Sequence, residues 1–215
     1  MKLYFMRHGE TAWNEQGLLQ GSTDIPLNDY GIQLAIATAE GLAAEGTVYD
    51  QIFPSPLLRA SQTARIIAKK QGVPAIADQR LREMCFGEYE GMKISEIMEN
   101  PKHERFARFF KAPAQYEKVG TSESFEDATI RAKEFLEECI LPLENTCENV
   151  LVVCHGGIVR VFLCLIGSIP YEDYWKIYQP NCCVSLTELK NGKLSLIDTG
   201  RTYYDLKNQA GRKFV

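Results

Sequence analysis

The sequence predicts an α/β fold, a three-layer α/β/α sandwich with a mostly parallel central sheet and a small helical cap. Apolar runs of strand length alternate with segments of helical spacing along most of the chain. The clearest run, residues 149–154 (NVLVVC), is apolar throughout its centre, as expected of a strand buried on both faces. Two late apolar runs flank Asn191-Gly192 and predict a β-hairpin at the C-terminal end.

The first part of the chain predicts two units, each a strand followed by a helix. Residues 2–6 (KLYFM) form a short apolar run that ends just before Arg7, and residues 49–53 form a second run. After a turn-rich stretch, Asn28 can cap a helix that ends near Gly46. A second helix follows a break at two prolines and carries its apolar residues at helical spacing: Leu57, Leu58, Ala60, Ala64, Ile67 and Ala68.

The middle of the chain predicts loops and a cap. Residues 73–77 form a third extended run, whereas residues 81–91 contain too much glycine and polarity for a core element, so Glu83 is expected on a loop. Short helical pieces bounded by Pro101 and Pro113 predict a cap insertion at roughly 92–120. The whole chain, 1–215, is expected to form one domain that includes this insertion.

The last part of the chain completes the alternation of elements. Residues 124–141 have the spacing of an amphipathic helix that ends before Pro142. The strand at 149–154 is followed by His155-Gly156-Gly157 and an apolar helix over 158–166. The hairpin strands are expected at 184–189 and 194–198.

Composition limits the classes of ligand and location. The net charge of −4 gives no general attraction to nucleic acid or to an anionic membrane, so an anionic ligand needs a local cluster of cations. The seven cysteines form an odd set without a Cys-x-x-Cys pair, which argues against a disulfide framework and a zinc ribbon. We therefore expect reduced thiols, a cytoplasmic location, no nucleic-acid or membrane partner, and a small phosphorylated molecule as ligand.

Two of the three histidines stand where ligand sites of α/β sheets form. His8 and His155 each follow a predicted buried strand and are each followed by glycine. Arg7 and Arg59 add guanidinium groups, whose planar fork matches two oxygens of a phosphate. No matching cluster of acidic residues or thiols accompanies the two histidines, so neither a metal nor another cofactor is expected.

The chain resembles the histidine phosphatase superfamily, the phosphoglycerate mutase-like group, in six segments that follow one another in the family's order. These are RHGETAWN (7–14), LQGSTDIPLN (19–28), SPLLRASQTA (55–64), LREMCFGEYEG (81–91), TSES (121–124) and CHGG (154–157). The segment at 121–124 departs from the family's Gly-Glu-Ser form because Ser122 stands in the glycine position, which leaves the role of Glu123 open.

The resemblance implies roles for eight residues. His8 accepts the phosphoryl group and Glu83 donates a proton to the leaving alcohol. The phosphate is held by three further side chains: Arg7, Arg59 and His155. The phosphate or substrate pocket is lined by Asn14, Gln20 and Gly21.

Elementary chemistry agrees with these roles. A histidine attacks phosphorus only through an unprotonated ring nitrogen, and nearby guanidinium groups lower the pKa of an imidazole, so His8 is expected to be neutral. Charge on the transferring phosphoryl group is stabilised by positioned cations. The leaving alkoxide needs an acid, for which Glu83 is the candidate.

Three functions remain open from the sequence. The preferred one is a phosphomonoesterase that hydrolyses small phosphorylated metabolites through a phosphohistidine. The first alternative is a phosphoglycerate mutase, which returns the phosphoryl group from the same histidine to a sugar-acid hydroxyl. The second is a non-catalytic binding module on this fold, because a fold alone does not fix an activity. The stretch FGEYEG (86–91) resembles the phosphatase branch more closely than the mutases.

Overall fold

The computed structural model describes residues 1–205 of the chain. A five-stranded sheet forms its centre, in the order β2-β3-β1-β4-β5. The strands are β1 (Lys2–Arg7), β2 (Gln51–Pro54), β3 (Asn149–Cys154), β4 (Val184–Lys190) and β5 (Lys193–Arg201). The pairs β1-β3 and β2-β3 are parallel, whereas β1-β4 and β4-β5 are antiparallel. The sheet is therefore mixed, with a parallel part built from the strands that precede the predicted site.

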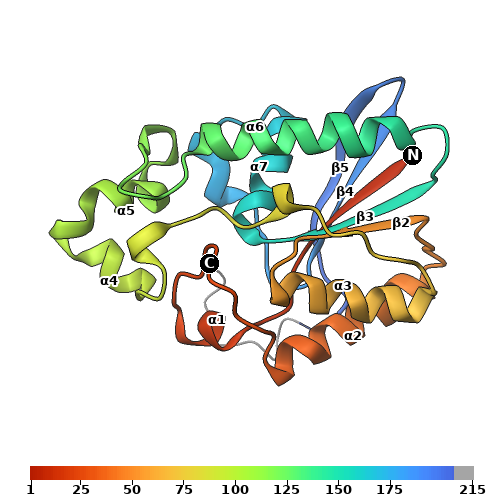
Figure 1. Ribbon diagram of the computed structural model, residues 1–215, viewed down its shortest axis with the longest axis horizontal. Coiled ribbons are helices and arrows are strands. Elements are labelled where there is room, and N and C mark those ends of the chain that lie inside the picture. The colour runs from red at the N-terminus through yellow and green to blue at the C-terminus, as the bar shows by residue number, and fades with distance from the viewer. Residues whose placement is uncertain (206–215) are drawn as a thin grey trace.

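Helices cover both faces of the sheet (Figure 1). One face carries α2 (Asp29–Ala44) and α3 (Leu58–Gln71), and the other carries α6 (Phe125–Phe135) and α7 (Gly156–Gly167). Side chains alternate along β1, so Leu3 and Phe5 belong to the core under α6 and α7, whereas Tyr4 and Met6 belong to the core under α2 and α3. This confirms the predicted α/β/α sandwich.

The remaining helices lie beyond the carboxyl ends of the parallel strands. Helix α4 (Ile94–Glu99) and helix α5 (Glu104–Lys111) occupy the predicted cap segment and project from one end of the sheet (Figure 1). Phe106 and Phe109 of α5 are buried, whereas Arg108 is exposed, as the spacing of the aromatic residues predicts. The cap therefore packs through an aromatic face.

Helix caps fix where several helices begin. The side chain of Asn28 accepts a hydrogen bond from the backbone N–H of Gly31 at 2.7 Å, which confirms the predicted cap of α2. Ser124 and Asp127 form a reciprocal capping box at the start of α6. In the hairpin, Asn191 and Gly192 both have positive φ, at 53° and 72°, as a two-residue type I′ turn requires.

The structure differs from the expected elements at several boundaries. Helix α1 (Ala12–Gln16) lies in the turn-rich stretch and was not predicted, because five residues are too few to show a hydrophobic period. Residues 73–77 make a single bridge, from Ala75 to Ile52, and no longer strand. Helix α6 ends at Phe135 and continues as a π turn over 136–140, before Pro142 disfavours further helix.

Shorter turns complete the described chain, and the C-terminal residues 206–215 of the predicted domain lie outside the described residues. The 3₁₀ turn Gly87–Tyr89 falls in the segment expected to be a loop, 81–91, and a second one, Gln79–Leu81, ends at its first residue; Glu83 lies between them. The other short turns are Pro101–His103, Pro113–Gln115, Leu141–Leu143 and Tyr171–Lys176.

Candidate active site

The two predicted histidines meet at the carboxyl edge of the parallel strands. Arg7 of β1 is paired in register with Cys154 of β3, so the next residues along each strand, His8 and His155, leave the sheet side by side. Their ring centroids lie 5.2 Å apart, and both residues are buried. The convergence expected from the sequence is therefore confirmed.

His8 is held in one tautomer. Its Nδ1 lies 2.6 Å from the carbonyl oxygen of Gly9, and because a carbonyl only accepts, Nδ1 carries the hydrogen. Burial lowers the pKa of His8 well below its usual value of 6.5, and the charges of Arg59 and Arg7 lower it further. The ring is therefore neutral, with a free lone pair on Nε2.

Arg59, the second residue of α3, is completely buried beside these rings. Its Nη1 donates to the carbonyl of Thr23 at 2.8 Å, and its Nη2 donates to the carbonyl of Gly21 at 2.6 Å. Its Nε donates to Nδ1 of His155 at 3.1 Å. Burial lowers the pKa of Arg59 to about 10, so the group keeps its charge at neutral pH.

His155 is the N-cap residue of α7 and, like His8, is buried. Because Arg59 Nε donates to Nδ1, the hydrogen of His155 is on Nε2, which donates to Oγ of Ser55 at 2.8 Å. Burial lowers the pKa of His155 well below 6.5, and the charge of Arg59 adds to this effect. Its Nε2–H can therefore reach a phosphate only by leaving Ser55.

Arg7 presents an unused donor at the site. Its Nη1 donates to the carbonyl of Gln179 at 2.6 Å. Its Nε is buried and has no hydrogen-bond partner within the described residues 1–205. A buried N–H without an acceptor is costly, and an anionic oxygen is the partner that best satisfies a guanidinium.

Glu83 reaches the start of α7 from its loop. Its Oε2 accepts from the backbone N–H of Gly157 at 2.9 Å, and its Oε1 accepts from the N–H groups of Ile158 at 3.1 Å and Met84 at 3.0 Å. A Cβ on Gly157 would lie 2.5 Å from Oε1 of Glu83, so a glycine is needed for this close approach. The carboxyl group is thereby fixed at the pocket wall.

These groups surround a cavity of about 610 Å³. Seven of the eight predicted site residues line it: Arg7, His8, Asn14, Gln20, Gly21, Arg59 and Glu83. His155 is not among the lining residues and is bonded to Arg59, which is one of them. The outer part of the cavity is lined by apolar and aromatic residues from the cap and its surroundings, including Phe86, Met98, Phe109, Phe110 and Trp175.

The family model of the histidine phosphatase superfamily (branch 1) matches residues 3–201. The chain belongs to this superfamily. It is 32% identical over 197 residues to putative phosphoserine phosphatase 2 of Hydrogenobacter thermophilus, covering 91% of this chain and 93% of the relative. It is 30% identical over 186 residues to a probable phosphoglycerate mutase of Yersinia pestis, covering 86% of this chain and 83% of the relative.

A solved structure gives the same result for the fold. The structure of YhfR from Bacillus stearothermophilus has 30% identity and a TM-score of 0.84, and the match covers 94% of this chain and 97% of that one. The family, the fold and the assembled site together identify this histidine phosphatase as a phosphomonoester hydrolase.

The predicted pocket residues of this histidine phosphatase have structural partners as well. The hydroxyl of Thr11 lies 3.2 Å from Oδ1 of Asn14 and 3.0 Å from Oε1 of Gln20, so it links the two side chains. Gly21 has a φ of 57°, and a Cβ there would lie 2.2 Å from a carboxylate oxygen of Glu90. A glycine at position 21 therefore lets the chain turn so that its carbonyl meets Arg59.

Sequence reasoning missed several polar residues at the site, among them Ser55 and Arg160. Ser55 is the first residue after β2, at the same sheet edge as the two histidines, and this position was a usable signal. Arg160 lies in the apolar helix α7, where a lone charged residue was the signal. It is buried, donates to the carbonyls of Gly156 and Ile177, stacks over Trp175 at 4.7 Å, and lines the cavity.

Other candidate chemistries find little support in the described part of the chain. Cys154 is fully buried, and burial raises the pKa of its thiol, so it is a poor nucleophile. Within residues 1–205, no group of three or more His, Cys, Asp or Glu side chains is arranged to hold a metal ion. No helix in that range is both long and apolar enough to cross a membrane.

Proposed function

We propose that the chain hydrolyses small phosphomonoesters by transferring the phosphoryl group to Nε2 of His8 and then to water. The observation that carries this proposal is the 2.6 Å hydrogen bond from His8 Nδ1 to the carbonyl of Gly9. It fixes the tautomer that has its lone pair on Nε2, and burial keeps the ring neutral. A nucleophile is thus ready before substrate binds.

The phosphate is held by the two guanidinium groups that lower the pKa of His8. Arg7 offers its unpaired Nε, and Arg59 is fixed by two backbone carbonyls and by His155. Charge gathers on the equatorial oxygens during phosphoryl transfer, so cations already held in place stabilise the transition state. His155 accepts from Arg59 at Nδ1, and its one N–H, on Nε2, now donates to Ser55.

Glu83 protonates the leaving oxygen as the ester bond breaks and the bond from phosphorus to His8 forms. A protonated carboxyl keeps a lone pair on each oxygen, so backbone N–H groups can hold it while its O–H points into the cavity. The resulting carboxylate then accepts a proton from water as the water oxygen attacks phosphorus. Inorganic phosphate leaves, and His8 and Glu83 return to their starting states.

The cavity supports a small substrate, and the phosphoserine phosphatase name of one relative makes phosphoserine a suitable first compound to assay. The aromatic outer wall suits an organic leaving group beside the cationic phosphate site. The seven free thiols support the expected reducing, cytoplasmic location.

Trapping the covalent intermediate tests the proposal. Wild-type protein, incubated briefly with ³²P-labelled phosphoserine and quenched in SDS at alkaline pH, should retain a label that acid treatment then removes, as expected of a phosphohistidine. His8→Ala should retain none, whereas His103→Ala, which changes the third histidine, should retain the wild-type amount. His103 packs on Tyr89 in the cap, with ring centroids 5.5 Å apart. Equal labelling of the His8→Ala protein would overturn the assignment.

A mutase is the second candidate, because one relative carries that name. It uses the same phosphohistidine, so labelling does not separate the two functions. We expect this chain to release inorganic phosphate from 3-phosphoglycerate without forming 2-phosphoglycerate. Isomerisation faster than phosphate release would replace hydrolysis with the mutase reaction.

A further inference from the structure

The loop that carries Glu83 has little regular structure of its own. Between the 3₁₀ turn Gln79–Leu81 and Cys85 it forms no helix or strand. The side chains of Leu81 and Met84 are fully buried and anchor the loop to the core. The N–H groups that hold the carboxyl group of Glu83 bind only the end of its side chain, so the position of the loop backbone at residue 83 needs a further explanation.

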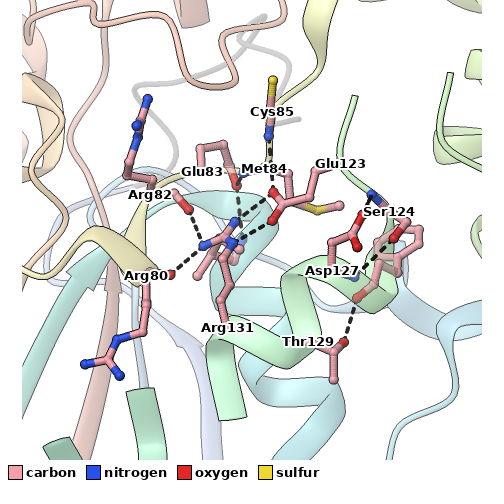
Figure 2. Close-up of polar contacts among 12 residues, drawn as sticks. Arg80, Arg82, Glu83, Met84, Cys85, Glu123, Ser124, Asp127, Thr129 and Arg131 are labelled. Carbon is pink, nitrogen blue, oxygen red and sulfur yellow. Dashed lines mark hydrogen bonds and ion pairs between the residues drawn. The ribbon is translucent and has the colours of Figure 1, made fainter. Parts of the chain in front are cut away.

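An ion pair that involves the neighbouring helix α6 supplies this explanation. Arg131 of α6 and Glu123, just before that helix, form a two-pronged pair, with Nε to Oε1 at 2.6 Å and Nη2 to Oε2 at 2.9 Å. Both side chains are more than four-fifths buried, at 18% and 17% exposure. Figure 2 shows this pair directed at the loop that carries Glu83.

The pair contacts the loop on both sides of Glu83. Nη1 of Arg131 donates to the carbonyl of Arg82, at 2.7 Å, and to that of Arg80 (Figure 2). On the other side, the backbone N–H of Glu123 donates to the carbonyl of Cys85 at 2.7 Å, and Oε2 of Glu123 accepts from the N–H of Cys85 at 3.3 Å. Three backbone groups that flank residue 83 thus bond to the side chains of the ion pair, and a fourth, the carbonyl of Cys85, bonds to the backbone of Glu123.

The turn before Glu123 has its own support. Ser122, which stands where the family has glycine, is buried, and its hydroxyl accepts from the N–H of Val119 at 2.7 Å and bonds to the hydroxyl of Tyr116 at 2.8 Å. The serine therefore fastens this turn, and Glu123 emerges from a fixed backbone.

We propose that Arg131 and Glu123 are positioning residues for Glu83, which set where its carboxyl group meets the leaving oxygen. This inference rests on the proton-donor role given to Glu83 above. Its consequence is selective: loss of the ion pair slows substrates whose leaving group needs a proton and spares substrates whose leaving group does not. A purely structural role would slow all substrates alike.

Geometry and charge make separable contributions. The positive charge of Arg131 is among the influences that lower the pKa of His155, after burial, Arg59 and His8. Lysine at position 131 keeps that charge but has one nitrogen in place of the three of a guanidinium group. It therefore cannot bond to both carboxylate oxygens of Glu123 and to two backbone carbonyls at the same time. Arg131→Lys therefore tests the geometry alone.

The experiment compares kcat/KM for glycerol 3-phosphate, a poor leaving group, with kcat/KM for p-nitrophenyl phosphate, a good one. This ratio reports the steps up to departure of the alcohol and leaves out the shared hydrolysis of the phosphohistidine, in which Glu83 acts as the base. Glu83→Gln is the reference and should lose ~10²-fold to 10⁴-fold on glycerol 3-phosphate only. Arg131→Lys and Glu123→Gln should lose up to ~10²-fold on that substrate, the effect of a misplacement of about 1 Å, with little change on p-nitrophenyl phosphate.

Two further proteins complete the design. Lys118→Met is the matched control, because Lys118 makes an exposed ion pair, at 3.4 Å, with Asp127 of α6, the helix that carries Arg131. This variant should match wild type on both substrates. The double variant Glu83→Gln/Arg131→Lys should be no slower than Glu83→Gln alone, since both changes remove one function. Losses that multiply, or that are equal on both substrates, would overturn the positioning role.

The outcomes separate this inference from the proposed function. If Glu83→Gln is selective and Arg131→Lys is not, only the positioning role fails. If Glu83→Gln itself slows both substrates equally, the proton-donor role fails and the positioning role fails with it. Melting temperatures of all variants identify a loss of activity that comes from unfolding, and the two conservative variants, Arg131→Lys and Glu123→Gln, keep the test available if larger changes do not fold.

Discussion

Arg59 donates a hydrogen bond from Nε to Nδ1 of His155 over 3.1 Å, deep behind the nucleophilic ring. The bond has two effects. It fixes the hydrogen of His155 on Nε2, and it completes the set of three acceptors that hold the guanidinium plane, the other two being the carbonyls of Gly21 and Thr23. Arg59 is thus a cation whose direction is set before a phosphate arrives, which is how a positioned charge lowers a barrier.

Arg59→Lys should therefore lower kcat by about 10²-fold or more on every phosphomonoester, because an ammonium cannot reach all three acceptors at once. The loss should not depend on the leaving group, since Arg59 serves the transferred phosphate. Steady-state kinetics on p-nitrophenyl phosphate and glycerol 3-phosphate measure both points. Arg65→Lys, at an exposed position of the same helix, is the control. Near-normal turnover in Arg59→Lys would show that the charge alone is sufficient.

The two buried histidines make stability depend on pH in a defined direction. Burial holds the pKa of His8 and of His155 well below 6.5 in the folded chain, so the unfolded chain binds protons that the folded chain does not as the pH falls below about 6.5. The free energy of unfolding should decrease with falling pH in that range. His8→Asn should reduce this slope by up to ~1.4 kcal/mol per pH unit. Urea unfolding at several pH values between 5 and 7 measures it, and identical slopes for both proteins would contradict the prediction.

Much of the fold and the meeting of the two histidines could be predicted from short-range patterns, whereas Glu83, Asn14, Gln20 and Gly21 were expected at the site only because the chain resembles the family. The apolar run at 149–154 predicts a buried strand, and the parallel pairing of this strand with β1 brings His8 beside His155. Each of these steps uses local periodicity or a rule about sheet edges. The position of Ser55 follows the same rule and could have been included.

The remainder depends on contacts between distant segments. Glu123 and Arg131 are only eight residues apart in the sequence. The loop that they bind, however, lies some forty to fifty residues earlier in the chain. No local pattern reveals that the loop passes there. Likewise, the sequence places His155 at the correct edge but does not show that Ser55 and Arg59 occupy its two ring nitrogens.

Gly157 is required by the position of Glu83. A Cβ at residue 157 would lie 2.5 Å from Oε1 of Glu83, and the carboxyl group, as the end of a flexible side chain, would have to move. Gly157→Ala should therefore slow glycerol 3-phosphate by ~10²-fold while sparing p-nitrophenyl phosphate. The melting temperature should stay close to that of wild type, because alanine is the better helix former. Normal turnover of both substrates would show that the proton donor does not need this position.

The cap depends on one aromatic side chain more than on its exposed residues. Phe109 is 1% exposed and lies between Phe86 and Trp175, with ring centroids 5.0 and 5.4 Å away, and its carbonyl accepts from the indole N–H of Trp175 at 2.7 Å. Phe109→Ala should lower the free energy of unfolding by about 3–5 kcal/mol, because it removes apolar contacts and leaves a cavity. Ile130→Ala, at a position that is 51% exposed, should change it by less than about 0.5 kcal/mol. Urea titration followed by tryptophan fluorescence measures both, and a loss below about 1 kcal/mol for Phe109→Ala would mean that the cap does not contribute to cooperative folding.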